Sequence, residues 1–194
     1  MLQLDYQLFE LINNLTEKIS FLNPIMIFLA SRAEYLFYAA VIIYWFTRTD
    51  KNRRMVFVAL VSAAIGLGIS VVLGDFFYRD RPFVAHEVFQ LVPHAVNASF
   101  PSDHATASFA IAMSIWFYRR KEGWLWLALA AAISFSRVWV GVHYPLDVTT
   151  GMVNGVLCAL LIHLVFSKWS PAKKLLEGIL KIYNKIEQSI WKKK

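Results

Sequence analysis

The sequence predicts an all-α fold: a polytopic membrane helix bundle of about five transmembrane helices, with an amphipathic helix at each end. Hydrophobic residues make up 58% of the 194 residues and charged residues only 17%, whereas soluble domains carry about 45–50% and about 25%. The apolar residues gather in long blocks, as membrane-spanning helices require. Most of the 20 basic residues lie between and after those blocks, which is typical of cytoplasmic loops. This pattern argues against a nucleic-acid partner and favours membrane lipids.

The two ends of the chain are expected to be amphipathic helices. Residues 1–20 place leucine and isoleucine at helical spacing with charged residues between them, which is too polar to span a membrane. Residues 168–194 repeat this pattern with lysines around an apolar stripe, and such a tail favours anionic lipid. The chain therefore divides into an N-terminal helix, a transmembrane domain over residues 21–167, and a basic tail.

Five apolar blocks between these ends are expected to cross the membrane. The first, residues 23–46, is interrupted by Arg32 and Glu34. It is either one long helix with an internal ion pair, or an interfacial piece followed by a span from about Tyr35. The other four blocks are residues 55–73, 105–118, 123–140 and 148–167.

The positive-inside rule gives the orientation of this multi-pass protein. Basic residues cluster in the first short loop, the third loop and the tail. If these are cytoplasmic, the N-terminus and the loop 74–103 lie outside and the C-terminus lies inside. Three polar segments then share the outer side: residues 79–83, 99–104 and 136–147. Topology alone predicts that they converge on one site.

Arginine and serine in these segments suggest a phosphate site. Arg81 and Arg137 present planar forks of donors that match phosphate oxygens. Arg137 also lies within a span, where a charge is costly and is a functional hypothesis by default. Ser102 is placed to cap the third span, and free backbone N–H groups at such a helix start favour a phosphate. Taken singly, each has an ordinary structural explanation, such as a helix boundary or a snorkelling side chain.

The histidines suggest catalysis. His143 and Asp147 are four residues apart, so a helix or helix-like turn would place them on one face. A hydrogen bond to Asp147 would fix the tautomer and free the other ring nitrogen as a nucleophile or base. His104, at the start of the third span, could donate a proton. No metal or cofactor is expected, because arginines rather than further ligands accompany these histidines. Gly151 and Gly155 form a GxxxG pattern that favours helix packing.

Taken together, these residues resemble the membrane branch of the type 2 phosphatidic acid phosphatase superfamily. The family has three motifs: Lys-x6-Arg-Pro, Pro-Ser-Gly-His and Ser-Arg-x5-His-x3-Asp. Here residues 136–147 match the third motif completely, residues 101–104 read Pro-Ser-Asp-His, and residues 81–82 keep the Arg-Pro of the first. The stretch 93–105 and the short five-span layout are similar to the bacitracin-resistance type of undecaprenyl-diphosphate phosphatase.

Two positions depart from the family pattern. Gly74 stands where the first motif has its lysine, so one phosphate contact is missing, and Arg79 is expected to take its place. Asp103 stands where the second motif has glycine. Its carboxylate suits the helix dipole but would repel phosphate if it pointed inward, so we expect it to point away or to orient a neighbour.

The resemblance implies metal-independent phosphoryl transfer. Its catalytic residues would be His143 as the nucleophile, Asp147 as its partner and His104 as the general acid, while Arg81, Arg137, Ser102 and Arg79 would hold the phosphate. The implied substrate is a lipid diphosphate at the outer face of a bacterial plasma membrane. A phosphatidylglycerol phosphate or other phospholipid phosphatase is the enzyme alternative. A lipid transport or carrier protein is the non-enzyme alternative, although the chain has no ATP-binding glycine-rich loop.

Overall fold

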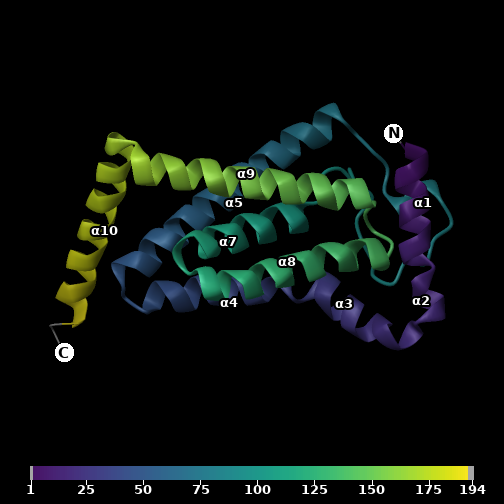
Figure 1. Cartoon of the computed structure of the whole chain (residues 1–194), viewed down its shortest axis with the longest axis horizontal. Coiled ribbons are helices and arrows are strands. Elements are labelled where there is room, and N and C mark those ends of the chain that lie inside the picture. Colours follow the sequence, from purple (N-terminus) through teal and green to yellow (C-terminus); the bar gives the residue numbers. More distant parts are fainter. Residues whose placement is uncertain (1, 192–194) are drawn as a thin grey trace.

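The computed structural model describes residues 2–191, and the regular structure within that range is entirely helical (Figure 1). The expected lysines at 192–194 lie outside the described residues. The elements follow the predicted blocks: α1 (Leu2–Asn13), α2 (Leu15–Lys18), the 3-10 turn η1 (Ser20–Leu22), α3 (Asn23–Ser31), α4 (Glu34–Phe46), α5 (Asp50–Phe76), α6 (Pro82–Ala85), α7 (Asp103–Tyr118), α8 (Arg120–Trp139), α9 (Pro145–Lys168) and α10 (Ser170–Trp191).

Two helices, α5 and α9, are each long and apolar enough to cross a membrane. The segments Ser20–Ser31 and Glu34–Phe46 meet that requirement only as a pair, bent by 47°. α7 has 16 residues, fewer than the roughly 20 that a perpendicular helix needs, and α8 begins with Arg120, Lys121 and Glu122. The polytopic membrane bundle is thus present, while the count of five crossings stays a prediction.

The N-terminal third is more broken than expected. Instead of one amphipathic helix over residues 1–20, α1 ends at Asn13 and α2 follows as a single turn. The buried Asn13 amide donates to the carbonyls of Phe89 and Trp139 at 2.9 and 2.8 Å, which ties this end of α1 to the loop between α6 and α7 and to α8. Of the two arrangements expected for residues 23–46, the structure shows the broken one.

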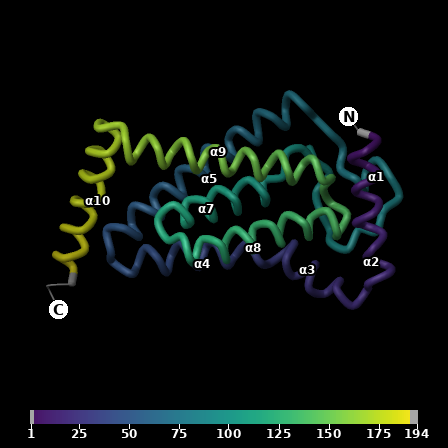
Figure 2. Tube along the Cα trace, in the orientation of Figure 1, coloured from purple at the N-terminus to yellow at the C-terminus, as the bar shows by residue number. Residues whose placement is uncertain are grey.

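The centre of the bundle is α7, which lies against α5, α8 and α9 (Figure 2). Small residues allow this approach, since a Cβ at Gly155 would lie only 2.4 Å from the Thr106 carbonyl oxygen of α7. The core around α7 is apolar and includes Met55, Phe109, Ile115 and Ile133.

α1 and α10 lie at opposite ends of the bundle (Figure 1). α1 packs across the end at which α8 turns into α9. α10 packs at the other end, against α9 and α5. The three segments singled out from the sequence all belong to the α1 end, and they meet there.

Candidate active site

Contacts around His143 link the three polar segments that the sequence singled out. Arg81, from the first, places its Nη1 3.1 Å from the His143 Nε2. The backbone N–H of Ser102, from the second, donates to the Asp147 carbonyl at 3.0 Å. Both histidine and aspartate belong to the third, so the structure brings the predicted segments into one site.

A tight turn between α8 and α9 presents His143. Gly141 has φ +82°, a conformation that side chains rarely adopt, and a Cβ there would lie 2.6 Å from the Phe89 carbonyl oxygen. Asp147 then occupies the third position of α9 and accepts the backbone N–H of Tyr144 at 2.9 Å. The cap of the helix therefore fixes Asp147 beside His143.

The contacts of His143 define its tautomer. Its Nδ1 lies 3.5 Å from the Asp147 Oδ2, as the four-residue spacing suggested. Its Nε2 faces Arg81, and a guanidinium can only donate hydrogen bonds, so Nε2 must accept. Burial lowers the pKa of His143 to about 4, although the bond to Asp147 opposes this. The imidazole is therefore neutral near pH 7, with its proton on Nδ1 and a lone pair on Nε2.

The Asp147 carboxylate is fully buried and well satisfied. Besides the Tyr144 N–H, it accepts the Ser99 hydroxyl at 2.5 Å and Arg79 Nη1 at 3.2 Å. Charged and neutral donors together favour the ionised form of a buried carboxylate. An anionic Asp147 can then stabilise the positive charge that develops on His143 when Nε2 reacts.

The two arginines of the expected anion clamp differ in their contacts. Arg81 uses most of its donors within the protein: besides His143, it donates to the Asn97 side chain and to the carbonyls of Ala98 and Val142, each at 3.0 Å, and one Nη2–H is left for a phosphate oxygen. Burial lowers the pKa of Arg81, yet arginine stays protonated near neutral pH. These contacts hold the charge of Arg81 rigidly next to the lone pair on His143.

Arg137 differs from Arg81 because more of its hydrogen-bond donors are unused in the described part of the chain. Its Nη1 donates to the Ala30 carbonyl at 2.7 Å, while its buried Nε and Nη2 have no hydrogen-bond partner among the described residues. Leaving such donors unpaired costs about 1–3 kcal/mol each, and more when they are charged. A phosphate oxygen would satisfy them, so this side chain is the clearest anion-binding feature of the site.

Arg79 does not fit the role expected for it. Its Nη1 lies 2.6 Å from the Asp5 Oδ2 and 3.2 Å from the Asp147 Oδ1. Its guanidinium also stacks on the Tyr144 ring, 3.5 Å from the centroid. Two carboxylates and an aromatic face already occupy this cation, so its contacts assign it to holding Asp147 rather than to replacing the family lysine.

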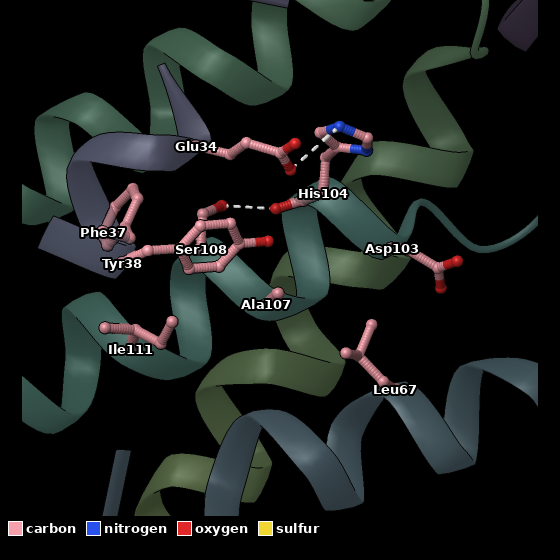
Figure 3. A pocket seen from close by; sticks show the side chains of 9 residues that line it. All are labelled: Glu34, Phe37, Tyr38, Leu67, Asp103, His104, Ala107, Ser108 and Ile111. Atoms are coloured by element: carbon pink, nitrogen blue, oxygen red, sulfur yellow. Dashed lines mark hydrogen bonds and ion pairs between the residues drawn. The ribbon is translucent and has the colours of Figure 1, made fainter. Parts of the chain in front are cut away.

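The second motif caps α7 and carries His104 into a cavity. The buried Ser102 hydroxyl accepts the Ala105 N–H at 3.5 Å, as predicted for an N-cap. The side chain of His104, on α7, faces α4 and borders a cavity of about 240 Å³ whose other walls are mostly apolar (Figure 3). Asp103 is exposed and also lines this cavity, with its carboxylate turned away from His104; its placement relative to the phosphate stays a prediction (Figure 3).

Sequence reasoning missed the partners that these residues use. Ser99, which donates to Asp147, and Asn97, which accepts from Arg81, carry no sequence signal that indicates these contacts. Asp5 was treated only as one charge of an amphipathic helix, yet it is 7% exposed and accepts the Leu146 N–H at 2.8 Å. Glu34, whose Oε2 lies 3.2 Å from the His104 Nε2, was signalled in the sequence because it interrupts an apolar block.

Comparisons with known proteins identify the family. A family model described as the PAP2 superfamily matches residues 55–171. The chain is 38% identical to the bacitracin transport permease protein BcrC of Bacillus licheniformis, over 97% of this chain and 91% of that protein. It is 34% identical to the undecaprenyl-diphosphatase BcrC of Bacillus subtilis (strain 168), over 98% and 97%. The crystal structure of Aquifex aeolicus LpxE matches with a TM-score of 0.72 and 26% identity, over 82% of this chain and 94% of that one. With the family match extending over more than half of its length, this multi-pass membrane protein belongs to the PAP2 superfamily.

Proposed function

We propose that the protein is an undecaprenyl-diphosphate phosphatase that releases undecaprenyl phosphate and inorganic phosphate, and so recycles the lipid carrier and confers resistance to bacitracin. The observation that carries this proposal is the state of His143: a neutral, buried imidazole with its lone pair beside Arg81 and its proton directed to Asp147. The likeness to the undecaprenyl-diphosphatase BcrC over nearly the whole chain supports the choice of substrate.

In the first step, the Nε2 lone pair of His143 attacks the terminal phosphorus and forms a P–N bond. The P–O bond to the bridging oxygen breaks, and its electron pair leaves with undecaprenyl phosphate, whose oxygen takes a proton from His104. Arg137 and Arg81 bind the equatorial oxygens, and the N–H groups at the start of α7 add to this stabilisation. Asp147 stabilises the charged imidazole of the phosphohistidine.

In the second step, His104 accepts a proton from water, and the resulting hydroxide attacks phosphorus. The P–N bond breaks, its electron pair returns to Nε2 of His143, and inorganic phosphate leaves. The residues of this chain thus supply the nucleophile, the acid and base, and the charge stabilisation.

The cavity beside His104 suits the start of the lipid chain. Since His104 protonates the leaving lipid phosphate, the isoprenoid must begin next to it. The walls there include Phe37, Leu67 and Ile111, and the space is bounded by α4, α5 and α7 (Figure 3). We place the first isoprene units in this cavity, with the remainder of the tail among lipids.

For the orientation, we propose that the α1 end faces the outside and that α10 lies on the cytoplasmic side. The basic residues of the first and third loops and of α10 support this orientation through the positive-inside rule. It places hydrolysis in the outer leaflet.

Phosphate release by purified protein tests the function. In detergent with EDTA present, wild type should release phosphate from undecaprenyl diphosphate, and His143→Ala should release none. Phosphatidylglycerol phosphate serves as the control for tail preference. A folded wild type that releases phosphate from neither lipid would refute the proposal. A protein that only transported lipid would need neither the His143–Asp147 pair nor the unpaired donors of Arg137.

A further inference from the structure

His104 has a carboxylate partner of its own. The Oε2 of Glu34 lies 3.2 Å from the His104 Nε2, and the two side chains are 32% and 25% exposed. Figure 3 shows the carboxylate directed at this nitrogen, while the other ring nitrogen, Nδ1, is turned away from Glu34. The site therefore contains two carboxylate–histidine pairs, His143 with Asp147 and His104 with Glu34.

The break between α3 and α4 is what brings Glu34 to His104. α3 ends at Ser31, the chain turns through Arg32 and Ala33, and α4 starts at Glu34. A straight helix through this region would continue the α3 direction, whereas the 47° bend lays the first turn of α4 beside α7. Glu34, the acidic residue that interrupts the apolar block, therefore lies at the site and contacts His104 instead of pairing with Arg32.

Electrostatics explains why a general acid here needs such a partner. The charged and titratable groups that act on His104 include the cations Arg81 and Arg137 and the imidazoles of His94 and His143. Positive neighbours disfavour a protonated imidazole, which is the form that donates a proton. Asp103, the next residue, points away (Figure 3). Glu34 is the carboxylate in direct contact.

We propose that Glu34 is a positioning residue for the general acid: it accepts the Nε2–H of His104, stabilises the imidazolium, and directs the Nδ1–H to the leaving oxygen. This inference rests on the proposed phosphatase function. When the P–O bond breaks, the proton on Nδ1 passes to the departing oxygen and His104 becomes neutral, still bonded to Glu34 through Nε2. The same Nδ1 then accepts the proton of the attacking water.

The dependence of the rate on the leaving group distinguishes a positioning role of Glu34 from a purely structural one. A general acid matters most when the leaving oxygen is a strong base and little when it is a weak base. Phenyl phosphate and p-nitrophenyl phosphate differ in this respect but share the transferred group. Both rates are measured on one preparation, so partial unfolding lowers both equally and leaves their ratio unchanged.

For Glu34→Gln, we expect kcat/KM for phenyl phosphate to fall about tenfold or more relative to p-nitrophenyl phosphate, since general acids contribute roughly 10²–10⁴. Glu34→Asp should restore part of the ratio, and Glu17→Gln, an exposed glutamate on α2, should leave it unchanged. In a His104→Ala background, Glu34→Gln should change the ratio no further. An unchanged ratio in the single variant, or a further change in that background, would overturn the proposal.

The aryl phosphates also keep the two proposals apart. If wild type cleaves them but not undecaprenyl diphosphate, the proposed lipid substrate is wrong, while the ratio still decides the role of Glu34. If wild type cleaves the lipid and Glu34→Gln leaves the ratio unchanged, the function stands and the role of Glu34 is refuted.

Discussion

A single methyl group added to α9 should separate the two halves of the site. A Cβ at Gly151 would lie 2.5 Å from the Ser102 carbonyl oxygen, about 0.9 Å closer than the 3.4 Å at which ordinary contact begins. The obstructing atom belongs to the backbone and cannot swing aside. In Gly151→Ala, the start of α7 must therefore move away from α9, which weakens the Ser102 N–H bond to the Asp147 carbonyl.

The size of the effect follows from two opposing terms. Overpacking of a tight core destabilises the fold by about 1–3 kcal/mol. Replacing a helical glycine with alanine stabilises it by about 0.5–1 kcal/mol. We expect the free energy of unfolding to fall by about 1–2 kcal/mol. For a chain of this size, Tm should fall by about 2–4 °C for each kcal/mol lost. Because the displacement falls between the catalytic segments, phosphate release should fall about 10- to 100-fold.

Two other glycines serve as controls. Gly155→Ala meets the Thr106 carbonyl oxygen at 2.4 Å, one turn farther from Asp147, so it should lower Tm to a similar extent with a smaller loss of activity. A Cβ at Gly68 would have nothing within 4 Å, so Gly68→Ala should leave both unchanged or raise Tm. A Gly151→Ala protein as stable and active as wild type would refute the reasoning.

Three further predictions concern charge. Arg137→Lys should raise KM at least tenfold in phosphate-release assays, because an ammonium cannot bond the Ala30 carbonyl and span two phosphate oxygens as the fork does. Asp5→Asn should leave Arg79 with one carboxylate, cost about 1.5–3 kcal/mol in a thermal melt, and lower kcat several-fold without changing KM. On the acid side, His143 loses its lone pair on protonation, so kcat/KM should fall with its midpoint near the pKa of about 4 rather than near 6.5; a midpoint near 6.5 would show that His143 is solvated.

The helices and the meeting of three motifs could be predicted because both depend on local signals. Long apolar blocks predict α5 and α9. The positive-inside rule then assigns the connecting loops to the two sides of the membrane. The four-residue spacing of His143 and Asp147 fixes their contact within a single turn of chain. The same logic predicted Ser102 as a cap. The cap at Ser102 and the contact between His143 and Asp147 need only a few neighbouring residues. The topology needs only the pattern of apolar blocks and basic loops along the chain.

Residues that reach the site from elsewhere could not be predicted in this way. The bond between Asp5 and the Leu146 N–H spans 141 positions, and nothing near either residue indicates the other. The contacts of Arg79 could not be predicted for a related reason: it was expected to replace the lysine missing at Gly74, but α1 supplies a carboxylate that engages it. The bend that brings Glu34 to His104 has neither proline nor glycine at the break, so the usual local sequence signals of a bend are missing there.

Gly74 shows how the fold accommodates the missing family lysine. A Cβ at this position would lie 3.1 Å from the Phe100 carbonyl oxygen, so the bare backbone of α5 lets the loop before α7 settle directly on it. That loop carries Ser99 to Asp147, and its preceding residues hold Arg81 against His143. Any side chain here would require the loop to shift by a few tenths of an ångström. If the proposed roles hold, the position of the missing lysine supports the loop that holds His143, and we expect phosphate affinity to depend more on the arginines.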